Sequence, residues 1–131
     1  MDRLARILDK GLLAPASCPE GLVRPTVQIQ VIGGRYVYDS LVFLHRFGPM
    51  SHRYTVYERG RFSILLDPSL PVLTREDMGQ HWMLLCPDEV YVHGSIPPEN
   101  FRGIAVHPDD AESALSELGG ELQRLGIPLY A

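Results

Sequence analysis

The feature of this chain that most restricts its fold is the grouping of its apolar residues into short runs separated by proline and glycine. The 131 residues include 11 Pro and 12 Gly, which are spread along the chain and do not form a linker. Apolar and polar residues alternate over 27–31, a pattern typical of a half-buried strand. Runs of the same short length predict strands over residues 27–31, 36–45, 62–66, 82–86, 90–92 and 102–107.

Helical periodicity is confined to the two ends of the chain. Residues 2–10 place three apolar side chains on one face and stop at Gly11, which predicts a short helix. A second helix is predicted to begin at Asp109 as N-cap, with Glu112 completing a capping pattern, and to end at Gly126. Its apolar stripe consists of Ala111, Ala114, Leu115, Leu118, Leu122 and Leu125.

These elements predict an α+β fold and not a regular βαβ series. Gly33-Gly34 is expected to form a hairpin turn, residues 96–100 a tight turn, and residues 127–130 a final strand. The length favours one domain spanning 1–131.

Composition indicates an ordinary globular chain. Hydrophobic residues make up 45% and charged residues 21%. The net charge of −4 argues against tight non-specific binding to nucleic acid. No apolar run approaches the roughly 18 residues of a membrane span, and the N-terminus lacks the features of a secretory signal, so we expect a soluble, cytoplasmic protein.

The basic residues are almost all arginine. Codon usage is the simplest explanation, but four of them fall close together and suggest a local positive patch: Arg46, Arg53, Arg59 and Arg61. The two cysteines, Cys18 and Cys86, are expected to be reduced thiols. Neither they nor the histidines show the spacing of a metal site, so no metal is expected. Phosphate-binding glycine loops and serine-nucleophile motifs are absent.

Glu89 stands at the start of a predicted strand. Glu89 and Tyr91 share one face of that strand, whereas Val90 and Val92 share the other. If the valines face the core, Glu89 faces a cleft or solvent. Spacing alone favours an exposed glutamate at a strand edge.

Three stretches of the sequence resemble a known family in the expected order. Residues 88–106, with Ile96-Pro97-Pro98-Glu99, resemble the catalytic-glutamate strand and following turn of the ADP-ribosyltransferase fold, particularly of the DarT-type DNA ADP-ribosyltransferase toxins. Residues 4–13 resemble the first helix of that fold, and residues 43–50 resemble a stretch that carries an active-site arginine.

The resemblance implies an ADP-ribosyltransferase-like split sheet of short, mostly antiparallel strands with an N-terminal and a C-terminal helix. It implies NAD as co-substrate and a nucleic-acid base as acceptor, with single-stranded DNA or RNA and an antitoxin protein among the partners. Glu89 and Arg46 would be the catalytic residues. The residues expected to bind the cofactor are His45, Phe47, Met50 and Tyr54. An aromatic side chain, such as Phe47, Tyr54 or Tyr57, would stack on nicotinamide.

Two departures from the family pattern keep other functions open. The family places a His-x-Ser/Thr strand before its first helix, whereas the given sequence begins at Met1, directly before this helix. Either the coding start lies upstream or the protein lacks part of the NAD pocket. Arg46 lies three positions before Pro49, whereas the family's arginine lies two before. The alternatives are a non-catalytic nucleotide- or protein-binding module on the same fold, an RNA 2′-phosphotransferase, and a purely structural domain. The enzyme hypothesis requires the Glu89 carboxylate to face a pocket that holds a dinucleotide.

Overall fold

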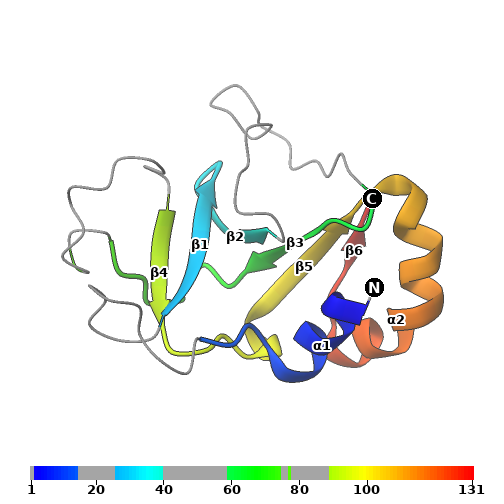
Figure 1. Cartoon of the computed structure of the whole chain (residues 1–131), viewed down its shortest axis with the longest axis horizontal. Coiled ribbons are helices and arrows are strands. Elements are labelled where there is room, and N and C mark those ends of the chain that lie inside the picture. Colours follow the sequence, from blue (N-terminus) through cyan, green and yellow to red (C-terminus); the bar gives the residue numbers. More distant parts are fainter. Residues whose placement is uncertain (1, 15–25, 40–58, 75–76, 78–88) are drawn as a thin grey trace.

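A computed structural model describes residues 2–14, 26–39, 59–74, 77 and 89–131 of the chain. The described part is an α+β fold (Figure 1). Its helices are α1 (Asp2–Lys10) and α2 (Ala111–Leu125), with short 3₁₀ turns η2 (Pro98–Asn100) and η3 (Pro108–Asp110). Its strands are β1 (Thr26–Ile32), β2 (Arg35–Asp39), β3 (Phe62–Leu66), β4 (Glu89–His93), β5 (Phe101–Val106) and β6 (Leu129–Tyr130).

The described strands form one sheet in the order β4-β1-β2-β3-β5-β6. Every neighbouring pair is antiparallel except β5 and β6, which run parallel. The expectation of a split sheet is therefore wrong for these strands. The physical reason is that β2 pairs with β1 on one side and with β3 on the other, so the hydrogen-bonded ladder is not interrupted.

Several elements lie where the sequence predicts them. α1 covers residues 2–10, β3 covers residues 62–66, and β1, β4 and β5 each match their prediction to within one residue at either end. Gly33 and Gly34 form the β1–β2 turn and both have positive φ, a conformation that costs glycine little.

The core lies between one face of the sheet and the two helices. Val27 and Ile29 of β1 lie opposite Val92 and Val90 of β4, and all four belong to or pack against the buried cluster. Leu4, Ile7 and Leu8 of α1 and Leu118 and Leu122 of α2 complete the cluster. Figure 1 shows both helices at the end of the sheet that carries β5 and β6.

The start of α2 differs from the prediction. Asp110, not Asp109, is the N-cap residue, and Pro108–Asp110 form the turn η3 before the helix. The Asp110 carboxylate caps no helix amide because it binds Arg59 and the Gly60 amide instead. The helix ends at Gly126 with φ 68°, as predicted for a left-handed cap.

One member of the predicted α2 stripe lies outside the core. Leu115 is 57% exposed, whereas Ala114, Leu118 and Leu122 are buried. At about 100° per residue, Leu115 lies at the margin of the face that those three residues define.

Some predicted elements lie outside the described residues: the strand over 82–86, the part of the 36–45 strand beyond Asp39, and both cysteines. Within the described helices, none is long and apolar enough to cross a membrane.

Candidate functional site

Glu89 is the first residue of the edge strand β4. It lies directly opposite Gln30 of β1, and its side chain is half-buried. Because Val90 and Val92 point into the core, the alternation of the strand places Glu89 on the sheet face away from α1 and α2. The predicted division of the two faces of β4 is therefore confirmed.

Tyr91 holds the Glu89 carboxylate. Its hydroxyl donates a hydrogen bond to Glu89 Oε1 across two positions of the same strand face. Tyr91 is only 5% exposed, and its backbone amide and carbonyl both bond to Leu73, which extends the sheet beyond β4. A buried ring on a doubly paired backbone gives the hydroxyl a fixed position, so the carboxylate is oriented before any ligand binds.

The Glu89 carboxylate has a second oxygen, Oε2. Among the described residues, Oε2 of Glu89 has no hydrogen-bond partner. Gln28 and Gln30 of β1 lie opposite Tyr91 and Glu89 and continue the polar strip on the same face. A half-buried carboxylate with one satisfied oxygen can accept a hydroxyl hydrogen bond or stabilise a nearby positive charge.

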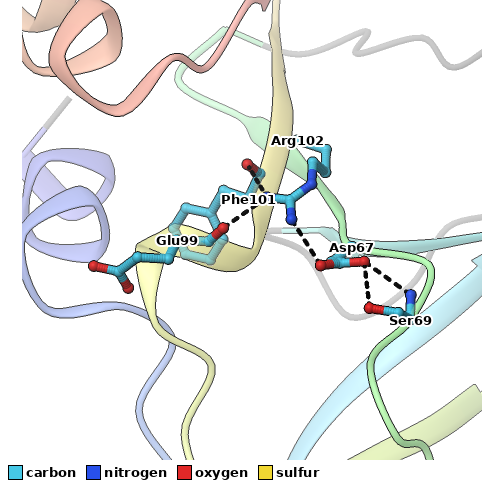
Figure 2. Close-up of polar contacts among 5 residues, drawn as sticks. All are labelled: Asp67, Ser69, Glu99, Phe101 and Arg102. Atoms are coloured by element: carbon cyan, nitrogen blue, oxygen red, sulfur yellow. Dashed lines mark hydrogen bonds and ion pairs between the residues drawn. The ribbon is translucent and has the colours of Figure 1, made fainter.

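A cluster of polar contacts around Arg102 fixes the turn after β4 (Figure 2). Arg102 donates to the carbonyl oxygens of Glu99 and Phe101 and forms an ion pair with Asp67 at 2.7 Å. The Ser69 amide and hydroxyl both donate to Asp67, and these bonds, with the charge of Arg102, lower the Asp67 pKa. The cluster thereby ties the turn between β4 and β5 to the end of β3.

The same turn is joined to the residues that follow α1. Leu12 and Ile96 exchange two backbone hydrogen bonds of 2.9 and 2.8 Å, and the Ser95 hydroxyl accepts a bond from the Ala14 amide. Gly11 has φ +84°, and a Cβ there would lie 2.3 Å from the Ile96 carbonyl oxygen. Two of the three stretches that carry the family resemblance are therefore in direct contact.

The predicted arginine patch is not borne out at its two described members. Arg61 is 3% exposed and so contributes no surface charge. The Arg59 charge is paired, because its Nε lies 2.7 Å from Asp110 Oδ1. The pKa of Asp110 is lowered, first by the hydrogen bond from the Gly60 amide and then by Arg59. Arg46 and Arg53 lie outside the described residues.

The other predicted site residues lie outside the described part of the chain: Arg46, His45, Phe47, Met50, Tyr54 and Tyr57. Among the described residues, no group of histidine, cysteine, aspartate and glutamate is arranged to hold a metal ion.

Two features of the described surface have no signal in the sequence. Tyr91 lies on the face predicted for it, but no pattern marks it as the partner that orients Glu89. The second feature is a groove beside α1, on the helix-covered face of the sheet. It is not the pocket that the enzyme hypothesis places beside Glu89, since Val27 and Tyr38 line it from the opposite face.

Comparisons of the chain with protein-family models, with curated proteins and with solved structures found no significant match.

Proposed function

We propose that this protein is an NAD-dependent ADP-ribosyltransferase in which Glu89 is the catalytic carboxylate. The observation that carries the proposal is the Tyr91–Glu89 hydrogen bond at the start of β4, on the polar face of the strand. It supports a carboxylate that is oriented in advance, which is what electrostatic catalysis requires.

The reaction breaks the bond between the nicotinamide nitrogen and C1′ of the ribose. The bond electrons stay with nicotinamide, which leaves as a neutral molecule, and positive charge develops on the ribose. In this proposal one oxygen of Glu89 positions a ribose hydroxyl and the carboxylate stabilises the charge. A nitrogen of the acceptor base then forms the new bond to C1′ and releases its proton.

Contacts between distant segments support the proposal further. The stretch resembling the family's first helix and the stretch resembling its catalytic strand meet through the Leu12–Ile96 bridge. Arg102 and Asp67 then fix the turn that follows the strand. These two matching stretches, 4–13 and 88–106, thus belong to one local structure.

The remaining roles come from the family resemblance. Arg46 is proposed to contact the acceptor base or a phosphate, and His45, Phe47, Met50 and Tyr54 to contribute to NAD binding. Single-stranded DNA is the first acceptor to test and RNA the second. An antitoxin protein is an expected partner of a toxin of this class.

The proposal is tested by nicotinamide release. Purified wild-type protein is incubated with NAD, with and without single-stranded DNA, and released nicotinamide is measured by chromatography. Glu89→Gln removes the charge but keeps the shape, and we expect it to lower turnover by at least about 100-fold. Glu99→Gln is the matched control, because it removes an exposed glutamate ten positions later and should retain wild-type turnover.

Two results would contradict the proposal. Equal turnover by wild type and Glu89→Gln would contradict the assignment of Glu89. Saturable NAD binding by wild type without any nicotinamide release would favour the non-catalytic nucleotide-binding module. A parallel reaction with an RNA that carries a 2′-phosphate tests the RNA 2′-phosphotransferase alternative, because that enzyme would consume NAD only when this RNA is present.

A further inference from the structure

A basic groove lies along α1, away from Glu89. It has a volume of about 440 Å³, and residues from α1, the segment that follows it, β1 and β2 line it. This volume is in the range of pockets that bind small molecules. Three exposed cations of α1 line it: Arg3, Arg6 and Lys10.

The cations are placed to act together. Positions i, i+3 and i+7 fall on one face of a helix, and at 1.5 Å per residue they span about 10 Å along its axis. Among the described residues, Arg6 and Lys10 have no ion-pair partner. Within the described part of the chain, their charges can therefore face an anion in the groove.

Tyr38 adds a hydroxyl to this basic edge. Arg3 Nη2 donates to Tyr38 Oη at 2.7 Å, so the phenol oxygen acts as acceptor toward Arg3. The phenol proton must then point elsewhere and can be donated to another acceptor. Arg3 also lies over the Phe62 ring, with its Cζ 5.9 Å from the ring centroid, which restrains the guanidinium.

The rest of the groove is apolar. Ile7, Leu12 and Val27 form part of its lining, and Leu13, which is 64% exposed, lies beside them. The combination of a row of cations with an apolar surface suits a ligand that has an anionic end and an uncharged body.

We propose that this groove binds a phosphorylated small molecule of nucleotide size, with its phosphates on Arg6, Lys10 and Tyr38 and its base or other apolar part on the apolar lining. Arginine and lysine are the side chains that proteins use for phosphate, and charge-assisted hydrogen bonds are the stronger kind. The site is independent of the proposed reaction centre, because the groove and Glu89 lie on opposite faces of the sheet.

Titration calorimetry at about 0.15 M salt, where exposed charges are already screened, tests the proposal. ADP serves as the probe. Adenosine tests the nucleoside without phosphates, and pyrophosphate tests the phosphates without the nucleoside. We expect saturable ADP binding and at least about tenfold weaker binding of each fragment. Arg6→Gln should raise the Kd for ADP about tenfold. Arg35→Gln is the matched control, since it removes the same charge at the exposed tip of the β1–β2 hairpin.

Two further measurements locate the site. In amide NMR spectra, ADP should shift the signals of residues 6–13. In the same spectra the signals of Glu89 and Tyr91 should not move, which separates this groove from the face of the sheet that carries Glu89. No saturable ADP binding, or equal affinity of wild type and Arg6→Gln, would overturn the proposal. An Arg6-dependent affinity for a 12-nucleotide single strand at least tenfold above that for ADP would also overturn it, in favour of a nucleic-acid site.

Discussion

Gly11 is a position where a side chain is excluded for two separate reasons. Its φ of +84° lies in the left-handed region, and a Cβ would approach the Ile96 carbonyl oxygen to 2.3 Å. That oxygen is itself engaged, because it accepts the hydrogen bond of Leu12 that joins the segment after α1 to the turn after β4. The single atom added by alanine would therefore disturb the contact between the two stretches.

A comparison of alanine substitutions at two glycines tests this exclusion. Gly34 also has positive φ, but a Cβ there would meet nothing within 4 Å. Gly34→Ala should lower the free energy of unfolding only by the backbone strain, about 1–2 kcal/mol. Gly11→Ala should lower the free energy of unfolding by about 3 kcal/mol, because overpacking adds to the strain. Urea unfolding of both variants measures the difference. Equal losses would show that the contact with Ile96 contributes nothing.

Asp110 connects two elements, the turn before β3 and the start of α2. Its carboxylate accepts hydrogen bonds from Arg59 Nε at 2.7 Å and from the Gly60 amide at 2.6 Å, and the residue is 7% exposed. These bonds favour the ionised form and lower the pKa of Asp110 below its ordinary value of 3.8.

The pH dependence of stability follows from this shift. A group with a lowered folded-state pKa stabilises the protein fully above its unfolded pKa, and that stabilisation is lost as the pH falls through the folded value. The Asp110 contribution should therefore be complete at pH 5 and above, and it should fall progressively as the pH drops below about 3.8 toward the folded-state pKa. Asp110→Asn should lower the free energy of unfolding by about 1–3 kcal/mol at pH 7 and by less at pH 2.5.

The variant is compared with wild type at each pH, because Asp67, Asp77 and Glu121 also have lowered pKa values and contribute to the pH dependence of both proteins. Chemical denaturation at a series of pH values gives the difference between the two proteins. Asp109→Asn, an exposed neighbour, serves as control. A difference between wild type and Asp110→Asn that stays constant from pH 7 to pH 2.5 would contradict the linkage.

The described part of the molecule is organised around one buried cluster. Both helices and the strands β1, β3, β4 and β5 all contribute side chains to it. Ile64, with no exposed surface, lies in the middle of β3. A cluster shared by so many elements leaves no subset of them with a core of its own.

Unfolding should therefore be a single cooperative transition. Ile64→Ala leaves a cavity and should lower the free energy of unfolding by about 2–5 kcal/mol. Circular dichroism, which reports on helices and sheet, and calorimetry should give the same reduced midpoint for this variant. Two separate transitions in either protein would show that the helices and the sheet unfold independently.

The local elements could be predicted from the sequence, because their signals lie within a few residues. The spacing of Leu4, Ile7 and Leu8 specifies α1, the Gly33-Gly34 pair specifies the hairpin, and alternation in β4 separates Glu89 from the valines. These features depend on periodicity and backbone freedom within a few residues.

Which of these elements contact one another depends on the fold of the whole chain. No local pattern reveals that Asp110 binds across fifty positions to Gly60 and therefore leaves the helix amides uncapped. The pairing of β2 with β3, which makes the sheet continuous, and the meeting of Leu12 with Ile96 likewise depend on hydrogen bonds between distant segments. Such contacts are selected by the energy of the whole packed chain, so residues close in sequence carry no signal for them.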